Sequence, residues 1–242
     1  MTNRDRNDAL DHSTEQSERD VVIDIGTVQL PGDLWVPSRA HSIIVFAHGS
    51  GSSRHSPRNR AVAEFFCRAG LATLLFDLLT AREEAEEEYT RRHRFNIPFL
   101  TDRLCGALHW LAIRKDIPHE RVGLFGSSTG AAAALEAAAR DDHVHAVVSR
   151  GGRPDLADKM LPLVKCPVLL LVGSLDTEVL ALNRQAARKL SNCQLDLVPG
   201  ATHLFSEPGT LDRVSELARD WFLRHLEASS SVDRLPDGSD RF

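Results

Sequence analysis

The chain has 242 residues, of which 42% are hydrophobic and 26% charged, and its 34 acidic residues outnumber 29 Lys and Arg to give a formal net charge of −5. This length fits a single α/β domain, and this composition excludes a collagen-like, disulfide-stapled or wholly disordered chain. The acidic balance argues against a nucleic-acid binder, which needs a basic surface to displace counterions from phosphates.

The sequence contains neither a membrane span nor an export signal that we can identify. Its apolar stretches are far shorter than the roughly 20 residues that cross a bilayer, and its N-terminus lacks the apolar region of a signal peptide. Four dispersed cysteines form no CxxC pair, which is typical of reduced thiols: Cys67, Cys105, Cys166 and Cys193. We therefore expect a cytoplasmic protein with no membrane partner.

The two ends of the chain differ from its middle. Residues 1–20 and 228–242 hold too few apolar side chains to offset the entropy of ordering. We expect both to be flexible tails around a single domain over residues 21–227.

Short apolar runs and longer segments of helical period alternate along that domain. The expected strands are Val21–Val28, Leu34–Val36, Ser42–Ala47, Ala72–Phe76, Val122–Phe125, Ala146–Ser149, Val168–Val172 and Leu195–Val198. The expected helices are Arg60–Ala69, Phe99–Ile113, Thr129–Ala139, Val179–Leu190 and Thr210–Leu226. The Pro and Gly of Leu30–Asp33 favour a turn between the first two strands.

This alternation predicts an α/β fold with a doubly wound, mostly parallel eight-stranded sheet and helices on both faces. The first two strands would form an antiparallel edge, and no separate cap domain is expected. Thr80–Pro98, with five Glu between positions 83 and 88, departs from the pattern. It fits a solvated helix or loop with charge pairs, or a short flap with Tyr89, Phe95 and Ile97 turned inward.

Residues Gly126–Gly130 carry the clearest chemical signal. They read G-x-S-x-G and stand between the strand Val122–Phe125 and an Ala-rich helix, the context that a nucleophile elbow requires. Small residues at both ends of the motif let strand and helix approach closely, while the turn lifts the Ser128 hydroxyl above the sheet. The start of the helix also directs backbone N–H groups at developing negative charge. Ser128 is therefore the candidate nucleophile.

A serine nucleophile needs a base and a carboxylate that orients it. Asp176 and His203 each follow a predicted strand, at the edge where open α/β sheets place their sites, and in the order Ser, Asp, His. Asp155 follows an earlier strand and is an alternative acid. The backbone amide of Thr129 and an amide of the loop after Ser42–Ala47, Ser50 first and Gly51 second, are the candidate oxyanion donors.

Four motifs follow predicted strands in this order: HGSGSS, GSSTG, GSLD and GATH. On these motifs the chain, from about Val21 to Leu226, resembles the α/β-hydrolase superfamily, and in its uninterrupted layout the dienelactone-hydrolase-related branch. Dienelactone hydrolases proper use a cysteine nucleophile, whereas this chain has Ser128. The resemblance therefore implies a serine esterase.

We expect a cofactor-independent, metal-free serine hydrolase that cleaves a small carboxylic ester, lactone or thioester, as a monomer or homodimer. Leu79, Phe95 and Phe205 are candidate apolar lining of its pocket. Arg150, or Arg153, is a candidate to bind a substrate carboxylate through its planar guanidinium. Two alternatives remain open: a catalytically silent ligand-binding module of the same fold, and an acyltransferase that uses the same three residues.

Overall fold

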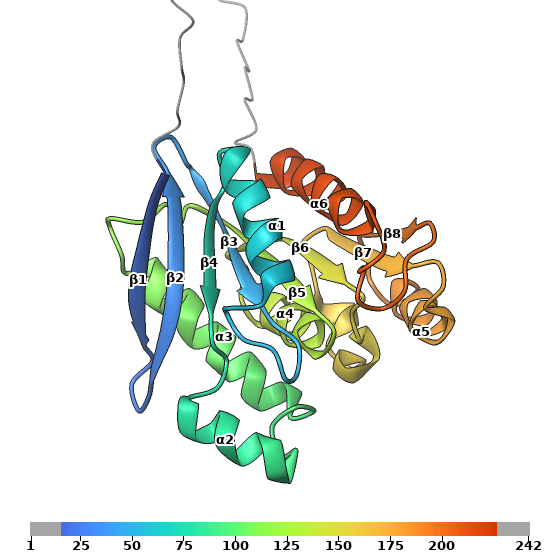
Figure 1. The fold of residues 1–242 in the computed structure, drawn as a ribbon, viewed down its shortest axis with the longest axis horizontal. Coiled ribbons are helices and arrows are strands. Elements are labelled where there is room, and N and C mark those ends of the chain that lie inside the picture. Colours follow the sequence, from blue (N-terminus) through green and yellow to red (C-terminus); the bar gives the residue numbers. More distant parts are fainter. Residues whose placement is uncertain (1–15, 227–242) are drawn as a thin grey trace, which may run out of the picture.

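The computed structural model describes residues 16–226, which form one eight-stranded sheet in the order β1-β2-β4-β3-β5-β6-β7-β8 (Figure 1). The strands are β1 (Gln16–Asp24), β2 (Gln29–Pro37), β3 (Ser42–Ala47), β4 (Ala72–Phe76), β5 (Arg121–Ser127), β6 (Val144–Arg150), β7 (Val168–Gly173) and β8 (Cys193–Val198). β1 and β2 pair antiparallel, as do β2 and β4, and all other pairs are parallel. The predicted mostly parallel sheet with an antiparallel edge is confirmed.

Helices cover both faces of the sheet, so the doubly wound prediction is also confirmed (Figure 1). α1 (Pro57–Arg68) and α6 (Thr210–Leu226) bury one face, and α3 (Ile97–Ala112), α4 (Thr129–Arg140) and α5 (Thr177–Ala187) bury the other. The remaining helical elements are α2 (Ala81–Thr90) and two 3₁₀ turns, η1 (Pro154–Ala157) and η2 (Leu161–Leu163). Within residues 16–226 no separate cap domain interrupts these layers.

The first two strands differ from the sequence prediction. Residues 16–20, expected in the N-terminal tail, form the first half of β1, because they pair in register with β2. Pro31 and Gly32, expected in a turn, lie inside β2; a Cβ at Gly32 would stand 3.1 Å from the Leu75 carbonyl oxygen, so this glycine permits close strand pairing. Residues 1–15 and the expected tail 228–242 lie outside the described residues.

The charged segment after β4 forms a capped helix. Thr80 begins α2 with a reciprocal capping box, in which its hydroxyl accepts from the Glu83 amide and the Glu83 carboxylate accepts from the Thr80 amide. Of the three side chains expected to turn inward, Ile97 is buried, but Tyr89 is 87% exposed and Phe95 59% exposed. The flap interpretation is therefore wrong for these two aromatic residues.

A carboxylate occupies the inner face of α2 instead. Glu87 is 2% exposed and accepts hydrogen bonds from the His93 amide (2.6 Å) and from the Arg94 guanidinium (2.7 Å) and amide (3.2 Å). Burial by itself would raise the pKa of Glu87, but these donors hold it below its ordinary value. The carboxylate therefore stays ionised and fixes the turn after α2, which meets the loop after β3.

Between Gln16 and Leu226, the structure contains no helix that is both long enough and apolar enough to cross a bilayer.

Candidate active site

Ser128 occupies a backbone conformation that a serine rarely adopts, with φ 50° and ψ −122°. It stands between the end of β5 and the start of α4 and is partly exposed, whereas its neighbours Ser127 and Thr129 are buried. Such strained residues cost about 1–3 kcal/mol each and persist only where the surrounding structure imposes them.

The glycines on either side make this turn possible. A Cβ at Gly126 would stand 2.4 Å from the Ala131 Cα, and one at Gly130 would stand 2.2 Å from the Ala47 carbonyl oxygen. Both distances are far below van der Waals contact, so only glycine fits at either position.

Asp176 and His203 meet at the carboxyl ends of β7 and β8. Asp176 Oδ2 lies 2.7 Å from His203 Nδ1, and the Asp176 side chain is 13% exposed. Asp176 is the N-cap residue of α5, a position where aspartate usually accepts a hydrogen bond from the helix, yet its side chain makes no such bond. Because its carboxylate is directed at Nδ1–H, the other ring nitrogen, Nε2, is left to act as a base.

The two loops that carry this pair are bound to each other. The Ser174 amide donates to the Val198 carbonyl and the Leu175 amide to the Ala201 carbonyl, each at 3.0 Å. A Cβ at Gly173 would stand 2.3 Å from the Ala201 carbonyl oxygen, so this glycine lets the two loops touch. The Asp176–His203 distance is thus set by backbone contacts.

Ser128 and His203 both lie beside the peptide that joins Arg150 to Gly151, but the described residues include no hydrogen bond between them. The Ser128 amide donates to the Arg150 carbonyl at 3.3 Å, and the next residue, Gly151, lies against the histidine: a Cβ there would stand 3.6 Å from His203 Cε1. Asp155, the alternative acid, binds Arg153 at 2.8 and 2.9 Å instead. The structure therefore pairs the histidine with Asp176.

The expected oxyanion donors differ in availability. The Ser50 amide donates to Thr129 Oγ1 at 3.0 Å, so in this state it is not free. The Ser50 hydroxyl donates to the Arg94 carbonyl at 2.9 Å, and the Thr129 hydroxyl must therefore donate to Ser50 Oγ, also at 2.9 Å. Thr129 begins α4, and its own amide has no intrahelical acceptor.

Gly51 is exposed and has open space around its Cβ position, so the structure does not bring it against Ser128. Gly49, which we did not predict, does approach: a Cβ there would stand 3.0 Å from the Ser128 Cβ. Its position directly after His48, at the start of the loop after β3, is the sequence feature that could have identified Gly49.

His48 holds this loop against the neighbouring one. Its Nε2 accepts a hydrogen bond from the Leu78 amide at 3.0 Å, which leaves Nδ1 protonated and able to donate to the Gly49 carbonyl, also at 3.0 Å. Burial lowers the pKa of His48, so the ring stays neutral in this fixed tautomer.

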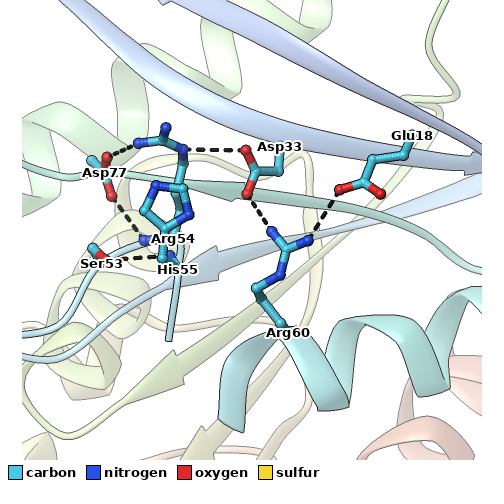
Figure 2. A network of polar contacts seen from close by, with 7 residues as sticks. All are labelled: Glu18, Asp33, Ser53, Arg54, His55, Arg60 and Asp77. Atoms are coloured by element: carbon cyan, nitrogen blue, oxygen red, sulfur yellow. Dashed lines mark hydrogen bonds and ion pairs between the residues drawn. The ribbon is translucent and has the colours of Figure 1, made fainter. Parts of the chain in front are cut away.

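An ion-pair network anchors the far end of the same loop, as Figure 2 shows. Asp77, after β4, accepts from the amide of Arg54 at 2.8 Å and also from its guanidinium, whose Nε donates to Asp33 at 3.2 Å. Asp33 in turn binds Arg60 of α1 at 2.7 Å, and Arg60 reaches Glu18 of β1 at 3.1 Å. The network ties the loop after β3 to β1, β2, β4 and α1.

The expected pocket residues are divided between cavity, core and surface. Leu79 lines a small cavity with Ser50 beneath α2. Phe205 is 2% exposed and packs on Gly151 within the core. Phe95 is 59% exposed and does not line the small cavity, so its contact with substrate stays a prediction. Arg150 is buried beside the site.

The cysteines are poor candidates for the nucleophile. All four are free thiols, and burial raises the pKa of Cys67, Cys166 and Cys193 to about 11. Among residues 16–226 no three His, Cys, Asp or Glu side chains come together in a way that could hold a metal ion.

Comparisons with known proteins agree with this fold. The model of the dienelactone hydrolase family matches residues 31–228. A crystal structure of a dienelactone hydrolase from Anabaena variabilis is 52% identical and superposes with a TM-score of 0.86, over 88% of this chain and 99% of that one. The esterase Est1E of Butyrivibrio proteoclasticus shares the fold, with 16% identity and a TM-score of 0.72 over 85% of this chain and 98% of its own.

A curated relative from Mycobacterium tuberculosis, named a putative phosphoribosyl transferase, is 53% identical over 222 residues. The match covers 90% of this chain but 49% of that protein, so the chain spans about half the length of this relative.

The network in Figure 2 generates a stability prediction. Arg54→Met leaves Asp77 and the buried Asp33 short of a charged donor, so we expect a loss of about 1.5–3 kcal/mol in the free energy of unfolding, measured by urea denaturation. Arg82→Met is the matched control, because the Arg82 side chain is 90% exposed in its pair with Glu86; its effect should stay within about 0.5 kcal/mol. Equal stability of the two variants would show that the network does not anchor the loop.

Proposed function

The chain belongs to the dienelactone hydrolase family, and on that premise we propose that it is a serine hydrolase that cleaves a carboxylic ester through an acyl-enzyme on Ser128. The observation that carries the proposal is the strained, partly exposed Ser128 between two glycines that admit no side chain. A strained conformation at the end of a parallel strand is typical of a residue whose hydroxyl must face a substrate.

The proposed reaction uses three side chains. Ser128 Oγ attacks the ester carbonyl while His203 Nε2 takes its proton, and Asp176 holds the ring and stabilises the imidazolium. The tetrahedral intermediate collapses when His203 gives this proton to the leaving alcohol. A water molecule, deprotonated by His203, then attacks the acyl group, and the returning proton frees Ser128. Hydrogen bonds between catalytic groups often tighten only when substrate binds, so the Ser128–His203 bond would form in that complex.

The oxyanion of this intermediate would accept hydrogen bonds from the amides of Thr129 and Ser50. The Thr129 amide has no helical acceptor, but the Ser50 amide is bonded to the Thr129 hydroxyl. We therefore propose that the substrate displaces this hydroxyl from the Ser50 amide. Breaking this bond costs the free energy of one hydrogen bond, so the Thr129 hydroxyl slows the reaction by a corresponding factor.

Ester cleavage is better supported for this chain than phosphoribosyl transfer, the activity in the name of its longer relative. That name belongs to a protein of which this chain spans 49%, whereas the family match covers residues 31–228 of this chain. We propose a small-molecule ester, lactone or thioester as the substrate of the site.

The first test removes the nucleophile. We expect Ser128→Ala to lower kcat/KM for p-nitrophenyl butyrate by about 10³-fold or more, because the acyl-enzyme cannot form. Ser127→Ala is the matched control. The Ser127 hydroxyl is buried and has no role in the proposed mechanism, so this variant should keep most of the activity.

Equal rates in wild type and Ser128→Ala would contradict the proposal and favour a catalytically silent binding module. If ester products form only when an alcohol acceptor is added, the acyl-enzyme is right but the protein is an acyltransferase.

The second test concerns the competing hydroxyl. Thr129→Val removes the acceptor of the Ser50 amide while it preserves the backbone and the shape of the side chain, so we expect kcat to rise by about 2–10-fold, the equivalent of one neutral hydrogen bond. The rise should be absent in Thr129→Ser, which retains the hydroxyl. A tenfold fall in Thr129→Val would instead show that the hydroxyl itself serves the transition state.

A further inference from the structure

Arg150, the last residue of β6, is a buried cation without a partner. The residue is 8% exposed, and its Nη1 is fully buried with no acceptor. Within residues 16–226 its guanidinium takes part in no hydrogen bond or ion pair, and its Cζ lies 5.8 Å from the centre of the Phe125 ring. The guanidinium offers five N–H donors, and for those on the buried Nη1 the described residues supply no acceptor.

A second arginine, Arg58, is partly buried. Arg58 is the second residue of α1, and its Nε is buried without an acceptor. Its charge is close enough to act on Arg150: burial, and then the charge of Arg58, lower the pKa of Arg150 to about 10. Arg150 therefore remains a cation at neutral pH, and the start of α1 adds a partial positive charge.

Two other arginines of this chain are paired with carboxylates. Arg153, three residues after Arg150, binds Asp155 through two hydrogen bonds, and Arg103 binds Glu83 at 2.6 Å. A buried charge that lacks a counter-charge is strongly unfavourable. Arg58 and Arg150 together fit a site whose counter-ion arrives with a ligand.

The backbone of Arg150 lies next to the proposed catalytic residues. The Arg150 carbonyl accepts a hydrogen bond from the Ser128 amide, and the following residue, Gly151, packs against His203 and Phe205. Ser149 contacts the α4 side of the sheet, so the Arg150 side chain, one residue later, points to the α1 side. A group bound by Arg150 would therefore lie at the carboxyl edge of the sheet, the edge that also holds Ser128.

We propose that Arg58 and Arg150 bind an oxyanion, a carboxylate or a phosphate, that the substrate carries at a distance from its ester bond. Planar guanidinium groups bind both kinds of oxyanion through paired N–H···O bonds. The assignment of the oxyanion to the substrate rests on the proposed hydrolase function, whereas anion binding by the two arginines does not.

Thermal unfolding tests the binding site without any enzyme assay. In buffer of low ionic strength, inorganic phosphate or succinate should raise the Tm of the full chain saturably, and chloride at equal ionic strength should not. The anion with the larger effect identifies phosphate or carboxylate as the preferred group. Arg150→Met and Arg58→Met should each abolish this rise, while Arg153→Met, whose native charge already has a partner, should retain it.

The ligand-free proteins give a second, independent readout. Because Arg150→Met removes a buried charge without a partner, its Tm should equal or exceed that of the wild type. A purely structural arginine would behave in the opposite way. A lower Tm in Arg150→Met, or no effect of either anion on the wild type, would overturn the proposal.

A matched pair of esters tests the assignment to the substrate. We expect wild type to prefer mono-p-nitrophenyl adipate over neutral p-nitrophenyl hexanoate, and Arg150→Met to lose this preference by at least tenfold in the ratio of kcat/KM values. An unchanged ratio, with both esters hydrolysed, would refute the substrate assignment alone. If neither ester is hydrolysed by the wild type, the proposed function fails, and the Tm measurements still decide whether the anion site exists.

Discussion

The close approach of β5, α4 and the loop after β3 determines the geometry of the candidate site. Gly126 and Gly130 have no room for a Cβ, since Ala131 and Ala47 occupy that space, and Ser128 between them takes a positive φ. The fold places a strained serine at the carboxyl end of the sheet, with its side chain against Gly49. Packing of the core on both faces supplies the free energy that maintains this strain.

Polar contacts then hold the surrounding loops. His48, Arg54 and the Thr129–Ser50 pair connect the loop after β3 to β4 and α4, and Glu87 fixes the turn whose carbonyl at Arg94 meets Ser50. In these contacts each buried charge has a partner, as is usual in proteins. Within residues 16–226 the buried Arg150 and the partly buried Arg58 have none, and this contrast is the reason to regard them as a ligand site instead of a structural pair.

Local patterns predicted much of this arrangement. Ser42–Ala47 and Thr210–Leu226 have the predicted bounds, and the turns after β7 and β8 brought Asp176 to His203, because parallel strands end at one edge. The sequence favoured Asp176 and left Asp155 as an alternative; the structure pairs Asp155 with Arg153 and Asp176 with His203. The sequence could not reveal the β1–β2 register or the Glu87 anchor, because these depend on how the segment between the partners folds. The engaged Ser50 amide was equally hidden, since its acceptor lies 79 residues away.

The central claim is that Ser128 becomes acylated, and mass spectrometry of the trapped protein tests it most directly. After reaction with a fluorophosphonate, the intact mass should rise by one adduct, and fragmentation of the peptide that holds Ser127 and Ser128 should place the adduct on Ser128. Competition by p-nitrophenyl butyrate should slow labelling. An adduct on Ser127 or on another residue, or no adduct on the folded protein, would contradict the account.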